Sequence, residues 1–110
     1  MKRTRLKNKN KHAANDKRVK AELRKRYDPF ACIFCGREES EYTVIDAAHL
    51  LGKGAYPEYR TVVENVVPAC RDCHFKYDDN YHFRFEQDEH HNLTEMKERI
   101  KADEFQPLCR

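Results

Sequence analysis

Two pairs of cysteines, each with the spacing C-x2-C, constrain the fold of this chain more than any other feature. The first pair is Cys32 and Cys35 in CIFC, and the second is Cys70 and Cys73 in CRDCH. Each pair places two thiolates on one short turn, and two such turns supply the tetrahedral sulfur set that Zn²⁺ prefers. We therefore predict one structural zinc ion bound by these four cysteines.

An iron ion in a rubredoxin-like site and a redox-active dithiol are the alternatives for these cysteines. Nothing else in the sequence suggests electron transfer, and two pairs without a βαβ pattern differ from a thiol redox motif. The basic N-terminus lacks the apolar segment of a secretory signal. We therefore expect a reducing, cytoplasmic location, in which metal ligation is favoured over disulfides.

The size of the chain makes a stabilising metal plausible. A length of 110 residues suits one small domain, and 37% of the residues are charged, so the apolar core is modest. No apolar run approaches the roughly 18 residues of a membrane span, so we expect no membrane partner.

Positive charge is concentrated at the N-terminus. Residues 1–26 hold twelve Lys or Arg against Asp16 and Glu22, a balance of +10 that leaves −7 for the remainder of a chain of net charge +3. We expect MKRTRLKNKN to be disordered in isolation and to act as an arm that binds the phosphate backbone of nucleic acid. A solubilising tail is the alternative.

Residue patterns predict an α+β fold. β-Branched and aromatic residues favour strands at 41–50 and 61–70, separated by a loop at 52–60 that contains glycine and proline. Helices are predicted at 15–27, from residue 70 to 79 and, capped by Asn92, at 92–105. The chain then divides into a basic arm and helix at 1–28, a zinc-stabilised core at 29–82 and a C-terminal helical extension at 83–110.

The 34 residues between the cysteine pairs exceed the roughly 15–20 of a simple zinc ribbon. They contain His49 in AHL and Asn65 in EN, and His74 directly follows the last cysteine of the cluster. With both cysteine pairs, this order resembles the HNH endonuclease family over about residues 30–82. The sequence segments AHLLGKG, YPEYR and EN are similar to those of small phage-type members of this family.

The resemblance implies a small zinc-stabilised ββα-metal (HNH) core with flanking helices, and metal-dependent hydrolysis of DNA phosphodiester bonds in a bacterial or phage-infected host cell. By that resemblance His49 is the general base, and His74 binds a catalytic divalent ion such as Mg²⁺ or Mn²⁺. Asn65 bridges the loop backbone and holds the base in orientation. A histidine suits the base role because its pKa lies near neutrality.

One position departs from the family pattern. The residue before the base is usually an Asp or His that binds the catalytic metal, and here it is Ala48. Asp46 lies on the same face of the strand, one step back. Asp78 follows His74 by four residues and shares its helical face. We favour His74 with Asp46 as the metal ligands and keep Asp78 as the alternative.

The nature of the nucleic-acid contacts stays open. Lys53, Arg60 and Arg71 are candidates for phosphate binding, although each suits a solvated surface equally well. We expect weak sequence preference, with specificity supplied by a larger protein partner. The main alternative function is a non-catalytic, zinc-stabilised nucleic-acid-binding module, and a third is a structural zinc protein that binds a partner through its acidic C-terminal half.

Overall fold

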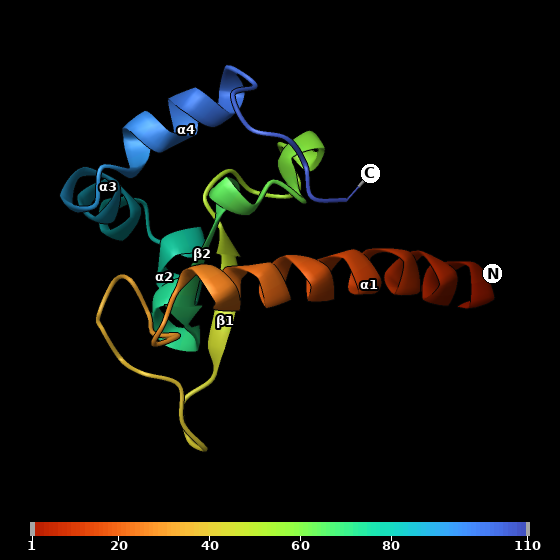
Figure 1. Ribbon diagram of the computed structural model, residues 1–110, viewed down its shortest axis with the longest axis horizontal. Coiled ribbons are helices and arrows are strands. Elements are labelled where there is room, and N and C mark those ends of the chain that lie inside the picture. The colour runs from red at the N-terminus through yellow and green to blue at the C-terminus, as the bar shows by residue number, and fades with distance from the viewer. Residues whose placement is uncertain (1, 110) are drawn as a thin grey trace.

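The chain has an α+β fold, as the residue patterns predict (Figure 1). The computed structural model describes the backbone of residues 2–109 and the side chains of residues 12–109. Within that part, the α-helices and strands are, in chain order, α1 (Lys2–Arg26), β1 (Ile45–His49), β2 (Val66–Cys70), α2 (Arg71–Asp79), α3 (Tyr81–His90) and α4 (Leu93–Lys101).

The centre of the fold is a strand–strand–helix unit. β1 and β2 pair antiparallel, with Ile45 opposite Cys70 and His49 opposite Val66. The connection between the strands contains two 3₁₀ turns, η1 (Pro57–Tyr59) and η2 (Val63–Asn65). α2 begins directly after β2, so the helix start and the strand end share one corner of the molecule.

Both strands are shorter than predicted. Residues 61–65 are largely buried, yet they form a turn in which the Asn65 amide donates to the Val62 carbonyl at 2.9 Å. A buried run of β-branched residues suits such a turn as well as a strand, because burial alone does not specify pairing. The first prediction also began too early, since β1 starts at Ile45.

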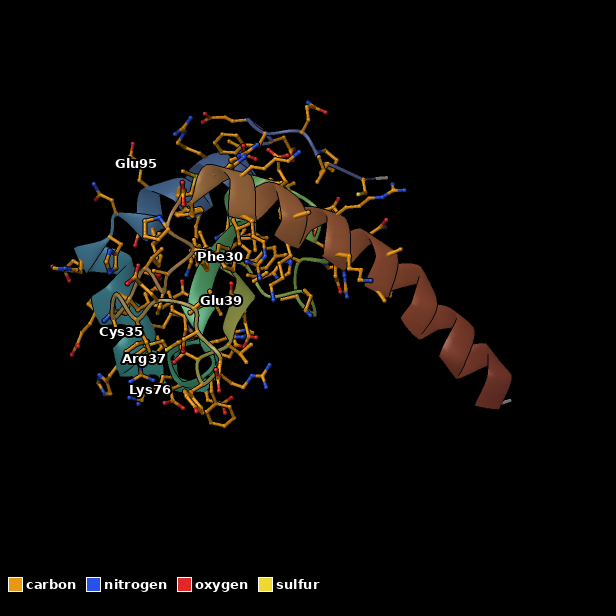
Figure 2. The ribbon with its side chains drawn as sticks, turned by 60° about the horizontal axis from the view of Figure 1, so that its bottom comes forward. Phe30, Cys35, Arg37, Glu39, Lys76 and Glu95 are labelled. Carbon is orange, nitrogen blue, oxygen red and sulfur yellow. The ribbon has the colours of Figure 1, made fainter. Side chains whose placement is uncertain are left out.

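The sheet carries a core on each side. The larger core joins the sheet to α2, to α4 and to the two C-x2-C turns, which we call the cysteine knuckles. Tyr77, Leu93 and Ile100 are buried in this core. On the other side α1 packs against β1, β2 and η2, and its residues Val19 and Leu23 are buried in this contact. Figure 2 shows the N-terminal part of α1 extending beyond the body of the molecule.

α1 is longer than the predicted helix at 15–27. The helix starts at Lys2, within the stretch expected to be disordered, because no glycine or proline interrupts residues 2–26 and most of its residues favour helices. Arg24, Lys25 and Arg26 occupy the last turn, where positive charge complements the helix dipole. The side chains of residues 1–11 lie outside the described part, so phosphate binding by this arm stays a prediction.

The C-terminal extension forms two helices. α3 starts at Tyr81, and the side-chain oxygen of the preceding N-cap residue, Asn80, accepts from the Phe83 amide at 3.0 Å. α4 ends at Lys101, before the predicted limit of 105. The predicted cap at Asn92 is absent, because this residue adopts a left-handed φ of 58° and its side chain makes no capping hydrogen bond. Among the described residues, no helix combines the length and apolar character needed to cross a bilayer.

Candidate metal centre and catalytic site

The four cysteines of the two C-x2-C pairs converge as predicted. Their sulfur atoms all lie within 4.8 Å of one another, and the Sγ atoms of Cys35 and Cys70 are 3.7 Å apart. Zn–S bonds of about 2.3 Å in a tetrahedron place the sulfurs about 3.8 Å from each other. The cluster of Cys32, Cys35, Cys70 and Cys73 can therefore hold a metal ion such as zinc.

Backbone hydrogen bonds fix the first knuckle against the sheet. The Cys32 amide donates to the Arg37 carbonyl and the Gly36 amide donates to the Cys32 carbonyl, each at 2.9 Å. Gly36 has a φ of 80°, which favours glycine because it lacks a Cβ. The Ile33 amide donates to the Pro68 carbonyl of β2 at 3.0 Å. The knuckle thus brings its sulfurs to the end of the strand that carries Cys70.

The surroundings of the thiols suit a bound cation. Burial raises the pKa of Cys73, and the sulfurs of Cys70 and Cys32 raise it further. Cys35 is an exposed residue at the edge of the body (Figure 2). Partial desolvation of its thiol tends to raise the pKa, but hydrogen bonds from the Arg37 backbone amide and the neighbouring thiols outweigh this effect, so the pKa of Cys35 is lowered. A metal ion would deprotonate all four thiols and offset their mutual repulsion.

His74, the residue after Cys73, lies between two carboxylates. Its Nδ1 is 3.1 Å from Oδ2 of Asp46 on β1, and its Nε2 is 3.3 Å from Oδ2 of Asp78, one helical turn further along α2. Both predicted candidates therefore contact the histidine, but at opposite ring nitrogens. An ion bound to one ring nitrogen of His74 can therefore be shared with only one of the two carboxylates. The other carboxylate would then orient the ring through the second nitrogen.

A hollow of about 300 Å³ distinguishes the two carboxylates. His49, His74 and Asp78 line it, whereas Asp46 does not. Asp46 instead accepts from Arg71, with the closest guanidinium nitrogen at 3.3 Å. Burial tends to raise the pKa of Asp46, but the hydrogen bonds from Arg71 and His74 outweigh it and hold the pKa below its usual value. Asp78 thus lines the hollow together with His74, whereas Asp46, the ligand favoured from sequence, contacts the other ring nitrogen of His74 and does not line the hollow.

His49 ends β1 with its ring oriented by the following loop. Its Nε2 lies 2.9 Å from the carbonyl oxygen of Arg60. A carbonyl oxygen only accepts hydrogen bonds, so Nε2 carries the proton and the neutral ring has its lone pair on Nδ1. Burial lowers the pKa of His49, and the positive charge of Lys53 lowers it further, against the Arg60 carbonyl, which raises it. The arrangement therefore favours a neutral imidazole able to accept a proton.

Asn65 is fully buried and joins the two ends of the loop. Its Oδ1 accepts from the Leu51 amide at 2.8 Å, and its Nδ2 donates to the carbonyls of Leu51 and Tyr59, each at 3.2 Å. Tyr59 directly precedes the residue whose carbonyl orients His49. The side chain thus bridges backbone across the loop, which is the geometry that the resemblance implies for this asparagine.

The three predicted phosphate contacts differ in their surroundings. Arg60 is paired with Asp16 of α1 at 2.8 Å, and Arg71 is paired with Asp46 at 3.3 Å. Lys53 lines the same hollow as His49 and His74. Sequence reasoning did not identify Arg84 of α3, which also lines this hollow. The sequence indicated only that Arg84 belongs to the helical extension. Its place beside the hollow depends on the packing of α3 against α2, which no local sequence pattern encodes.

Comparison with known proteins identifies no relative: no family model, curated protein or solved structure matches this chain. Among the side chains that the structure describes, the cysteine cluster is also the only set of three or more potential metal ligands whose ligand atoms, one from each residue, all lie within 4.8 Å of one another.

Proposed function

We propose that this chain is a metal-dependent HNH-type endonuclease or nickase that hydrolyses DNA phosphodiester bonds. The single observation that carries the proposal is one shared hollow, which is lined by the strand histidine His49, the helix histidine His74 and the carboxylate residue Asp78. A base, a metal-binding pair and space for a phosphate are the requirements of this hydrolysis.

His49 and His74 perform separate tasks in the proposed reaction. His49 Nδ1 takes a proton from water as the water oxygen forms its bond to phosphorus, and the bond from phosphorus to the departing 3′ oxygen breaks. His74 Nε2 and Asp78 would hold a divalent cation, which would supply positive charge to offset the negative charge that develops on the phosphate and the departing oxygen. Asp46 accepts from Nδ1 of His74 and fixes its ring.

The proposal is tested with supercoiled plasmid incubated with Mg²⁺, Mn²⁺ or similar ions. We expect nicking by the unchanged protein, and its loss in His49→Ala and His74→Ala. His82→Ala on α3 is the matched control, because His82 is exposed and does not line the hollow. Full activity in His49→Ala with an intact fold would remove the assigned base.

The pH dependence of nicking provides a second readout. His49 must be neutral to accept a proton, and its pKa is lowered by burial and by Lys53. Cleavage should therefore hold its plateau below about pH 6.5, where an ordinary histidine is already protonated. It should fall only as the pH drops through the lowered pKa. A decline centred above that ordinary value would contradict His49 as the base.

A second candidate function is a non-catalytic, zinc-stabilised DNA-binding module. It is favoured by Ala48, a buried residue at the position where the family usually carries a metal ligand. This reading predicts DNA binding without cleavage under any metal, so the plasmid experiment separates the two functions.

A further inference from the structure

A second hollow, of about 370 Å³, lies between α1 and β1. Ala13 of α1 and Ala47 of β1 both line it, and these small side chains leave open the space that larger residues would fill. The other lining residues are Asp16, Lys17, Val19, Lys20, His49 and Lys53.

The two hollows meet at the proposed base. Ala47, His49 and Lys53 line both of them, so His49 stands at their boundary. A DNA strand whose scissile phosphate lies near His74 would pass His49 and continue along the wall formed by α1. The second hollow is therefore placed to hold the backbone next to the bond that is cut.

The charge of this hollow suits a polyanion. Lys17, Lys20 and Lys53 line it, and their alkyl stems supply apolar wall from which the flexible ammonium ends can reach a bound phosphate. Asp16 is the only acidic residue among those that line it, and Arg60 pairs with this carboxylate through two nitrogens, at 3.2 and 2.8 Å. The positive charge of the three lysines is therefore not cancelled within the hollow.

We infer that the hollow between α1 and β1 is a subsite for a backbone phosphate, in which Lys17 and Lys20 contact the DNA strand beside the scissile phosphate. A lysine ammonium on a flexible stem binds phosphate as a point charge and tolerates any base sequence. DNA is favoured over an acidic protein because the lysines line a path that leads to the proposed base. The catalytic part of this inference rests on the proposed function.

Binding is tested without added divalent metal, by fluorescence anisotropy of a labelled duplex at several salt concentrations. The variant Lys17→Gln with Lys20→Gln is compared with Arg18→Gln with Lys25→Gln, which removes the same charge from the same helix. Arg18 and Lys25 are seven residues apart, share another helical face and do not line the hollow. We expect the hollow variant alone to weaken binding and to reduce the salt slope by about one per lysine.

Two outcomes of this comparison would overturn the inference. Equal loss in both variants would show that positive charge anywhere on α1 suffices. Displacement of the duplex by polyglutamate as effectively as by unlabelled DNA, at matched charge, would assign the hollow to an acidic protein instead.

Catalysis is tested with DNA and with bis(4-nitrophenyl) phosphate, a diester that has no neighbouring phosphates. Replacement of Lys17 and Lys20 should raise KM for DNA several-fold and leave hydrolysis of the small diester unchanged. Ala13→Leu fills the hollow without removing charge and should act in the same direction, whereas Ala14→Leu on the neighbouring face should not. Equal loss on both substrates would mean that these residues act only through the shape of the site, and the inference would fail. If the unchanged protein cleaves neither substrate, the proposed function fails and the binding comparison alone decides the subsite.

Discussion

Individual residues hold the proposed base in place through backbone contacts rather than through a second charged side chain. His49 donates from Nε2 to the Arg60 carbonyl, and the loop that presents this carbonyl is held by the side chain of Asn65. Arg60 is itself held by Asp16, so α1 also restrains the loop. The orientation of the imidazole therefore depends on loop geometry, which makes the buried amide a structural requirement.

Asn65→Asp should destabilise the protein strongly. The new carboxylate oxygen would face the carbonyls of Leu51 and Tyr59, where Nδ2 now donates two hydrogen bonds. A buried polar group without its partner costs about 1–3 kcal/mol, and a charged group costs more. Chemical denaturation measures the loss, with Asn15→Ala on α1 as a control at a partly exposed position. Equal stability of the two variants would show that the bonds of Asn65 do not hold the loop.

At the scale of elements, α1 is attached mainly by apolar contacts. Leu23 is completely buried and Val19 is 2% exposed. The described ion pairs that join α1 to the body are all partly solvent-exposed; they are Arg24 with Glu39, Arg26 with Glu64 and Asp16 with Arg60. Exposed pairs contribute only about 0–1 kcal/mol. Burial of two aliphatic side chains therefore accounts for the position of this long basic helix.

Leu23→Ala should cost about 2–5 kcal/mol of unfolding free energy, because it leaves a cavity between α1 and the sheet. Glu39→Gln, which removes the charge opposite Arg24 and leaves the stacking of Arg24 on the Phe30 ring intact, should cost less than about 1 kcal/mol. Guanidinium denaturation compares the two variants. A larger loss in Glu39→Gln would show that electrostatic attraction holds α1.

Regular residue spacings predicted structure better than helix boundaries could be predicted. The C-x2-C spacing predicted the convergence of the sulfurs, and the apolar spacing of Val19 and Leu23 predicted the buried face of α1. The separate helix α3 was missed, because Asn80 caps it only one residue after α2 ends and no glycine or proline marks the break.

The candidate site was predictable in its residues but not in its pairings. Asp46 and Asp78 were both identified, yet their contact with opposite nitrogens of His74 depends on how α2 lies on the sheet. Arg60, a candidate for phosphate binding, is paired with Asp16, 44 residues earlier in the chain, and the sequence did not predict this pairing. Contacts over such separations are set by tertiary packing, which leaves no signal in the spacing of residues.

At the scale of the whole molecule, charge is divided between α1 and the body. The N-terminal 26 residues carry +10 and the remainder carries −7. Among the side chains of residues 12–109, three ion pairs connect the two parts: Arg24 with Glu39, Arg26 with Glu64 and Arg60 with Asp16. A polyanion approaching the acidic body is repelled, whereas one approaching α1 is attracted. The proposed subsite between α1 and β1 lies on the attractive side and adjoins the proposed base.

The cysteine cluster joins two segments that lie far apart in the chain, and we expect removal of a bound zinc ion to unfold the core. Cys32 and Cys35 lie on the knuckle, and Cys70 and Cys73 on the corner between β2 and α2 that carries His74. Zinc binding contributes about 10–16 kcal/mol in zinc-finger peptides. This matches or exceeds the total stability of about 5–15 kcal/mol typical of a domain.

We therefore expect one zinc per chain by elemental analysis, cooperative loss of structure on treatment with a zinc chelator, and recovery when zinc is restored. Cys73→Ser should lose the metal and the fold, because burial and three neighbouring sulfurs make this position costly without a cation. Cys109→Ser is the matched control, since this thiol is free and lies outside the cluster. A Cys73→Ser protein that keeps its circular dichroism and melting temperature without bound metal would show that the apolar cores alone determine the fold, and His74 would then be positioned by packing rather than by the metal.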